Sequence, residues 1–316
     1  MSKPLELSKL RTVHLVPLTA FDSTGQLNSK LQFQHLRRMF QAGLRVYMPA
    51  AGTSEFHSLS ADEIVELVRI NRDACGPEAL IFAPVGLQLA HAIDVAKRSL
   101  AAGATGLMFM PFTHPYLSDA GVRDYIHAVL DAAPAPTLIY KKGPIPSDTL
   151  LLELADHPQV VGVKHAMNEV HEFRKLVLAD RGRIEWLCGT AERFAPFYML
   201  AGAPGYTTGA GNIAPHATLA MHAAFASGQF AEGLRLQQIL LPIEDFRARA
   251  GDSYNISMLK HAMKFLGQDF GEPRPPQRRL TSTEREEIES MISPIMAVEQ
   301  KLQTELTGVG LSQAVG

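Results

Sequence analysis

Short apolar runs alternate with longer amphipathic segments along most of the chain, and this alternation constrains the fold more than any other feature. Most of the runs lack the two-residue alternation of a strand with one face in water. Parallel strands that are covered on both faces have this continuous apolar character. The pattern therefore predicts repeated β-then-α units, with strands at residues 12–17, 46–50, 79–85, 106–110, 136–140, 160–164, 184–188 and 205–208.

The segments between the apolar runs carry helix start and stop signals. Residues 28–41 form an amphipathic pattern that ends near Gly43, where a glycine favours helix termination. Ser60 and Glu63 have the spacing of a capping box and predict the start of a helix that continues through residue 74. Residues 90–102 form a third helical pattern, which also ends at a glycine.

The number and spacing of these units predict a closed barrel. Eight β-then-α units in about 210 residues match a (β/α)8 TIM barrel better than a doubly wound open sheet. We therefore expect an α/β barrel at residues 1–214 and a C-terminal helical extension at residues 215–316 that packs on it. In this extension we expect helices at 217–227, 230–250, 254–266 and 282–302, a loop at 271–276 and a frayed end at 307–316.

Composition excludes several other classes of protein. The 30 Lys and Arg residues balance 32 Asp and Glu residues, so a basic footprint for nucleic acid is absent. Cys75 and Cys188 are the only cysteines, too few for a disulfide framework, which favours a reducing compartment. No apolar stretch is long enough for a membrane span and the start does not read as a leader, so we expect a cytoplasmic protein without membrane contact.

Two successive predicted strands end on residues that are suited to carbonyl chemistry. Tyr140 ends the run at 136–140 and Lys164 ends the run at 160–164. A lysine at the end of a buried strand loses hydration, which lowers its pKa and frees the amine to attack a ketone. A neighbouring tyrosine can transfer protons, so the pair predicts a Schiff-base enzyme. The alternative is a snorkelling lysine beside a packed core tyrosine.

The loop after the second run has the composition of a carboxylate site. Residues 50–56 read Ala-Ala-Gly-Thr-Ser-Glu-Phe, and the small residues allow backbone N–H groups to point at an anion. The hydroxyl of Thr53 can join them. The alternative is a flexible loop that ends in a helix cap.

Three motifs in order, the Gly-Thr-Ser-Glu loop, Tyr140 and the Val-Gly-Val-Lys run ending at Lys164, resemble a known enzyme family. From about residue 10 to residue 300 the chain is similar to the dihydrodipicolinate synthase/N-acetylneuraminate lyase family of class I aldolases. Residues 50–59 are most similar to 5-dehydro-4-deoxyglucarate dehydratases. The resemblance implies that Lys164 forms an imine with a 2-oxo acid and that Tyr140 transfers protons. It also implies that the loop holds the 2-oxo carboxylate and positions the tyrosine, through Gly52, Thr53 and Ser54.

A glycine-rich segment after the eighth run completes the site that the resemblance implies. Residues 205–212 read Gly-Tyr-Thr-Thr-Gly-Ala-Gly-Asn and resemble the family segment that lies over the bound pyruvate moiety. Thr207 and Thr208 are therefore expected to contact the imine region through backbone or hydroxyl groups. The alternative is a simple glycine-rich turn into the extension.

Two departures from the family pattern disfavour lysine biosynthesis. Residues 110–114 read Met-Pro-Phe-Thr-His where dihydrodipicolinate synthases have a tyrosine pair, and Tyr140 is followed by Lys-Lys-Gly instead of a segment with arginine. In an extended segment Lys142 projects to the same side as Tyr140, whereas Lys141 points away. We expect Lys142, together with His114, to bind a remote carboxylate of the substrate. The alternative is that both lysines are solvated loop charges.

The remaining polar residues near these motifs have weaker assignments. His57 and His165 are sequence neighbours of proposed site residues, and neighbours in an extended chain face opposite sides, so supporting or surface positions are expected. Glu55 is expected to brace its loop. The histidines show no metal-binding spacing, and we expect neither a metal nor a cofactor.

These observations favour a Schiff-base lyase that acts on a 2-oxo-3-deoxy sugar acid or a related 2-oxo acid, with dehydration preferred to aldol cleavage. Alternatives are a pyruvate-dependent aldolase with another aldehyde partner, a metal-dependent class II lyase, and a noncatalytic protein that binds 2-oxo acids. The resemblance also implies a homo-oligomer, a dimer or a tetramer.

Overall fold

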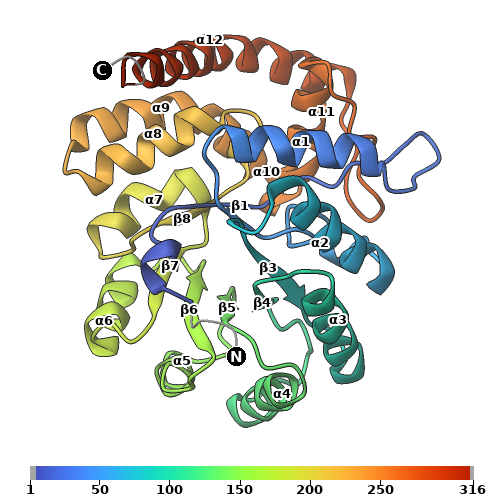
Figure 1. The fold of residues 1–316 in the computed structure, drawn as a ribbon, viewed down its shortest axis with the longest axis vertical. Coiled ribbons are helices and arrows are strands. Elements are labelled where there is room, and N and C mark those ends of the chain that lie inside the picture. Colours follow the sequence, from blue (N-terminus) through green and yellow to red (C-terminus); the bar gives the residue numbers. More distant parts are fainter. Residues whose placement is uncertain (1–4, 314–316) are drawn as a thin grey trace.

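Eight parallel strands close into a barrel at the centre of the molecule (Figure 1). The structure, a computed structural model, describes residues 5–313, with side chains to residue 305. Neighbouring strands pair in chain order, and β8 pairs with β1 to close the barrel. The strands are β1 (Val13–Leu15), β2 (Val46–Tyr47), β3 (Leu80–Val85), β4 (Gly106–Phe109), β5 (Thr137–Lys141), β6 (Val160–His165), β7 (Glu185–Cys188) and β8 (Tyr206–Thr208). The predicted closed barrel is thereby confirmed.

Helices between the strands form a ring around the barrel (Figure 1). Ser60 and Glu63 form the predicted capping box at the start of α2, with Ser60 N–H donating to Glu63 and Glu63 N–H donating to the Ser60 hydroxyl. The ring consists of α1 (Ser29–Gln41), α2 (Ala61–Cys75), α3 (Leu89–Ala101), α4 (Asp119–Ala132), α5 (Asp148–Leu154), α6 (Val170–Asp180), α7 (Ala191–Leu200) and α8 (Pro215–Ala226). Short 3-10 helices lie at Leu7–Leu10, Phe56–Ser58 and Ala210–Asn212.

The strands are covered on both faces, as their continuous apolar sequences predict. Every residue of β1, β3, β4 and β6 is buried, including the polar residues at the strand ends. This burial places the polar ends of β5 and β6 at the rim of an apolar core, where the βα loops begin. Within residues 5–313, no helix combines the length and the apolar character that a bilayer span requires.

The C-terminal extension packs beside α8 on one side of the barrel (Figure 1). It contains α9 (Phe230–Arg247), α10 (Arg249–Asp252), α11 (Asn255–Phe265) and α12 (Ser282–Gln313). The expected helix at 230–250 breaks earlier, because Ala250 and Asp252 adopt left-handed conformations with φ of 46° and 64°. The last helix continues past the expected end at 302, through most of the segment that we expected to fray, and residues 314–316 lie outside the described chain. The division at residue 214 stays a prediction, because α8 contacts both β1 and α9.

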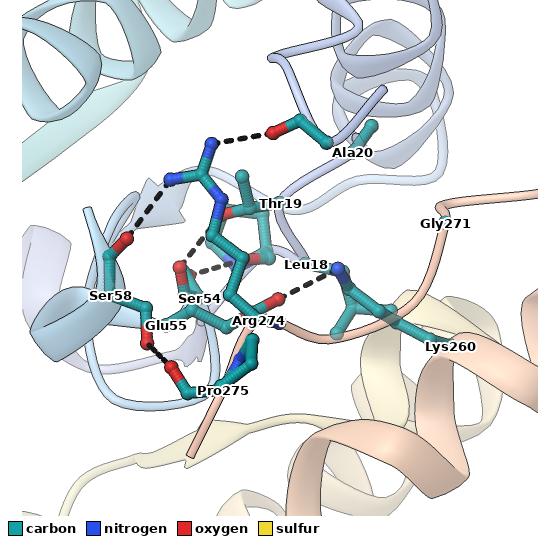
Figure 2. Close-up of polar contacts among 12 residues, drawn as sticks. Leu18, Thr19, Ala20, Ser54, Glu55, Ser58, Lys260, Gly271, Arg274 and Pro275 are labelled. Carbon is teal, nitrogen blue, oxygen red and sulfur yellow. Dashed lines mark hydrogen bonds and ion pairs between the residues drawn. The ribbon is translucent and has the colours of Figure 1, made fainter. Parts of the chain in front are cut away.

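A buried ion pair joins the extension to the loop after β2 (Figure 2). The Lys260 ammonium lies 2.7 Å from Glu55 Oε1, and the two side chains are 2% and 0% exposed. The backbone N–H of Arg274 donates to the other oxygen of Glu55 at 2.7 Å. The Lys260 ammonium and the Arg274 guanidinium both lie over the ring of Phe21, at 4.2 and 4.1 Å. Glu55 thus braces its loop, as expected from the sequence, and does so through the extension.

Removal of one partner of this pair is expected to destabilise the protein strongly. Glu55→Gln or Lys260→Met leaves one buried charge without compensation, which costs about 3–5 kcal/mol in comparable pairs. The free energy of unfolding from urea titration measures the loss. The matched control is Lys264→Met, because Lys264 pairs with Asp269 at the exposed surface of the same helix. A double variant with a loss equal to the sum of both singles would contradict the assignment of a coupled pair.

Candidate active site

Lys164 and Tyr140 lie side by side at the carboxyl end of the barrel. They are register partners on β6 and β5, and the Lys164 ammonium lies 4.0 Å from the centre of the Tyr140 ring. Both line a cavity of about 370 Å³ at the barrel mouth. The two residues that the sequence singles out are therefore brought together in one pocket, as expected for strands that are adjacent in the barrel.

The Lys164 amine is buried without an anionic partner. The residue is 4% exposed, and among the side chains described, residues 5–305, its ammonium has no hydrogen bond or ion pair. Burial lowers the pKa of Lys164 to about 7, and the nearby positive charge of Lys142 contributes in the same direction. A large fraction of the amine is therefore neutral near physiological pH, which is the form that attacks a carbonyl carbon.

Tyr140 presents a protonated phenol to the same cavity. Burial raises the pKa of Tyr140 above its usual value, the charge of Asp252 adds to this effect, and Arg247 opposes it. The residue is only half-buried, and within the described chain its hydroxyl has no hydrogen-bond partner. The phenol is thus available to donate a proton to a bound substrate.

Only some of the predicted site residues in the loop after β2 line the cavity. Gly52 and Thr53 line the cavity, and the Thr53 hydroxyl donates to Asn255 Oδ1 at 3.2 Å. Ser54 is buried outside it, where its hydroxyl donates to the carbonyl of Pro17 (Figure 2). No contact between the Thr53 hydroxyl and Tyr140 is found in residues 5–313, so positioning of the tyrosine by this hydroxyl stays a prediction.

Thr207 and Thr208 at the end of β8 both line the cavity. The Thr208 hydroxyl is committed to the protein, because it donates to the buried carboxyl of Glu192 and accepts from the N–H of Gly211 at 2.7 Å. Burial raises the pKa of Glu192 to about 7, and the carboxylate of Glu244 adds to this effect. The side-chain contact that remains open to a substrate at this strand end is therefore the Thr207 hydroxyl.

Lys142 and Tyr140 both line the cavity, and binding of a substrate carboxylate by Lys142 stays a prediction. The Lys142 ammonium lies 3.5 Å from the carboxylate of Asp252, and the two side chains are 53% and 55% exposed. Lys141 points away and is buried, with its ammonium donating to the carbonyl of Pro146 at 2.6 Å, so it is not a solvated loop charge.

The three histidines near these motifs take different positions. His114 lies exposed on the loop after β4 and is absent from the cavity wall, so the structure does not bring it to Lys142. His57 is exposed at the cavity wall. His165 is buried, with Nδ1 3.0 Å from the Tyr198 hydroxyl, and burial lowers its pKa to about 4.

Several cavity residues come from the extension and were not predicted from the sequence, among them Arg247, Asp252 and Asn255. These three come from the end of α9, from α10 and from the start of α11. No spacing pattern marks them, because they reach the barrel mouth only through the way the extension folds back. Within residues 5–313, no group of three or more His, Cys, Asp or Glu side chains is placed to hold a metal ion.

A closed barrel with an unpaired, buried lysine beside a tyrosine at its carboxyl end defines a class I Schiff-base lyase. The Dihydrodipicolinate synthetase family model matches residues 9–295, and the chain belongs to this family.

Relatives and solved structures agree with this assignment. A probable 5-dehydro-4-deoxyglucarate dehydratase from Azotobacter vinelandii is 29% identical over 92% of this chain and 97% of its own. A 5-dehydro-4-deoxyglucarate dehydratase from Pseudomonas putida is 27% identical over 93% and 99%. The crystal structure of dihydrodipicolinate synthase from Bacillus clausii superposes with a TM-score of 0.88 at 32% identity, covering 91% and 98%. The expected family resemblance is thereby confirmed.

The lowered pKa of Lys164 predicts the pH dependence of imine formation. The rate of borohydride trapping with pyruvate should rise with pH through about 7 and then level off, because the neutral amine predominates above this value. A lysine with an ordinary pKa of about 10.4 would still be gaining reactivity at pH 9. Mass spectrometry of the peptide that contains Lys164 measures the reduced adduct. Lys142→Gln should shift the midpoint to higher pH, since the charge of Lys142 lowers the pKa of Lys164. A midpoint near 10 in the parent protein would contradict the buried-amine interpretation.

Proposed function

We propose that this protein dehydrates a 2-oxo sugar diacid of the 5-dehydro-4-deoxyglucarate type through an imine at Lys164. The observation that carries the proposal is the buried amine of Lys164, which has no anionic partner and lies against Tyr140. The dehydratase relatives, which match nearly the whole chain, support the choice of substrate class.

The substrate name itself specifies the chemistry that the site must perform. In 5-dehydro-4-deoxyglucarate the ketone at carbon 5 lies beside one carboxylate, carbon 4 is a methylene and carbon 3 carries a hydroxyl. Attack by the Lys164 amine on the ketone, followed by loss of water, gives a protonated imine. This cation draws electrons from carbon 4, which loses a proton to form an enamine. The enamine then expels the hydroxyl of carbon 3 as water when a proton is supplied.

Tyr140 is the proposed proton carrier in these steps. Its phenol is protonated in the resting site, since burial raises its pKa, and it lies beside the amine that attacks. It can therefore protonate the carbinolamine oxygen as water leaves, accept the proton of carbon 4 as the resulting phenolate, and return that proton to the departing hydroxyl of carbon 3. Positioning of Tyr140 by Thr53 and contact of Thr207 with the imine region rest on the family resemblance and on the place of both residues at the cavity wall.

Lys142 is the proposed contact for the carboxylate at the far end of the diacid. It lies at the cavity wall opposite Asp252, and this half-exposed ion pair is a weak one by its nature. A substrate carboxylate can therefore replace or share the Asp252 contact at little cost. A monoacid would leave the existing pair undisturbed.

A second candidate function is a pyruvate-dependent aldolase of the synthase type, which the similarity to the dihydrodipicolinate synthase from Bacillus clausii favours. The same imine at Lys164 serves both reactions, since the enamine can attack an aldehyde instead of expelling a hydroxyl. The lysine pair after Tyr140, in place of the arginine segment of those synthases, disfavours lysine biosynthesis, and the resemblance of residues 50–59 to the dehydratases favours dehydration.

Cellular location and assembly also remain proposals. Both cysteines are free and buried, which suits a reducing cytoplasm. A dimer or tetramer is expected from the family resemblance, and exposed apolar side chains such as Tyr116 and Leu200 offer surface for contacts between copies.

Product analysis separates the two candidate reactions. With 5-dehydro-4-deoxyglucarate, a dehydratase removes water and releases no pyruvate, whereas an aldolase cleaves the carbon chain and releases pyruvate. We expect loss of substrate without pyruvate, measured by mass spectrometry and by an NADH-coupled pyruvate assay. Lys164→Ala is the inactive control. Stoichiometric release of pyruvate would contradict the dehydratase assignment and favour the aldolase.

The Lys142 proposal predicts a substrate-selective loss of affinity. At a pH above the Lys164 midpoint, where the amine is neutral with or without the Lys142 charge, Lys142→Met should raise KM for the diacid by several-fold with little change in kcat. Lys175→Met is the matched control, because Lys175 pairs with Glu172 on the exposed surface of α6. Steady-state kinetics with the diacid measures both variants. Unchanged KM in Lys142→Met would remove Lys142 from the substrate contacts.

A further inference from the structure

Arg247, the last residue of α9, brings a buried positive charge into the cavity from outside the barrel. Its side chain is only 7% exposed. A guanidinium has five donors in a planar fork and stays charged at every physiological pH. Such a group in a site for an acidic substrate needs a role, and neither imine formation nor proton transfer uses it.

Contacts within the extension fix the orientation of this guanidinium. Arg247 forms a buried ion pair with Glu244 through Nη1 and donates to Asn255 Oδ1 at 2.8 Å through Nη2. Its Nε has no hydrogen-bond partner within residues 5–313. The guanidinium is therefore held in a fixed orientation at the cavity wall, which is how a preorganised charged contact is built.

The guanidinium lies over the loops after β2 and β8. Nη2 is 3.5 Å from the Thr53 hydroxyl oxygen, and a Cβ at Gly209 would lie 2.6 Å from Cζ of Arg247. Only a glycine at position 209 leaves room for this approach. In the barrel order, β2 and β8 flank β1, which lies across the barrel mouth from the strands that carry Tyr140 and Lys164.

The hydroxyl groups on the loops beside Arg247 already donate hydrogen bonds within the protein. The hydroxyls of Thr53, Ser54 and Thr208 donate to Asn255, to the Pro17 carbonyl and to Glu192, respectively. The backbone N–H groups of Gly52 and Thr53 have no acceptor in the part of the chain that the structure describes. An anion at this wall is thus offered two N–H groups and one guanidinium.

We propose that Arg247 binds the carboxylate next to the reacting ketone, together with the N–H groups of Gly52 and Thr53. It is then a specificity-determining residue that restricts imine formation to 2-oxo acids. This inference rests on the proposed Schiff-base reaction at Lys164, and it leaves the second acid group of the substrate to Lys142. The carboxylate gains a charge-assisted contact that a neutral ketone cannot make.

The test compares trapping of two ketones by borohydride at Lys164. Pyruvate carries the carboxylate and hydroxyacetone lacks it, so their ratio isolates the carboxylate contact from any change in the amine itself. Arg247→Gln should lower trapping efficiency for pyruvate by roughly 10- to 100-fold relative to hydroxyacetone. Arg247→Lys should recover part of this selectivity, because it restores the charge without the planar fork.

Two further variants keep the test decisive. Glu244→Gln/Arg247→Gln removes the ion pair as a unit, so a folding defect caused by an unpaired Glu244 is avoided. Arg249→Gln is the matched control, since Arg249 lies two residues away and pairs with Glu287 outside the cavity. Equal losses for both ketones, or a parental ratio in the double variant, would overturn the proposal. The reaction proposed above is tested separately, because its failure shows as absent trapping in the parent protein or as pyruvate release from the diacid.

Discussion

The structure depends on one constraint, the burial of the Lys164 amine at the rim of a closed barrel without an acid to neutralise it. A buried ammonium without a partner is costly, and the protein relieves the cost by lowering the pKa of the amine to about 7. The barrel makes this possible because strand closure hides the β6 end while the βα loops leave a cavity above it. The positive charges nearby, at Lys142 and Arg247, further disfavour the protonated form.

The cavity is completed by two parts of the chain that are far apart in sequence. The barrel supplies the amine and the phenol, whereas the extension supplies Arg247, Asp252 and Asn255. The Glu55–Lys260 pair secures the loop after β2 to α11, so the loop that presents Gly52 and the helix that begins at Asn255 are held to each other (Figure 2). The reactive pair therefore lies on the barrel, whereas the proposed substrate contacts come from both units: Gly52, Thr53 and Lys142 from the barrel, and Arg247 from the extension.

The sequence predicted the barrel and its two principal residues because both are encoded locally. Continuous apolar runs report strands covered on both faces, and a lysine or a tyrosine that ends such a run must lie at the rim. The direction of hydroxyl groups was not predictable, since Ser54 and Thr208 could face the cavity or the protein and the choice depends on partners distant in sequence, Pro17 and Glu192. Arg247 was missed for the same reason. Helical periodicity places it at the end of α9, but its position at the cavity wall depends on how α9 packs against α7 and α8.

The Lys164 ammonium lies over the face of the Tyr140 ring, and this contact also matters after the lysine has formed an imine. An aromatic face carries partial negative charge and attracts any cation above it, whether a primary ammonium or an iminium. When the nitrogen becomes bonded to a ketone carbon, its positive charge is spread toward that carbon but remains over the same ring. The ring of Tyr140 thus stabilises the positive charge on the nitrogen both before and after the covalent bond forms, in place of water molecules. A phenylalanine at this position would keep the aromatic ring that stabilises the charge but would lack the hydroxyl that transfers protons. The Tyr140→Phe substitution therefore separates the two contributions of this side chain.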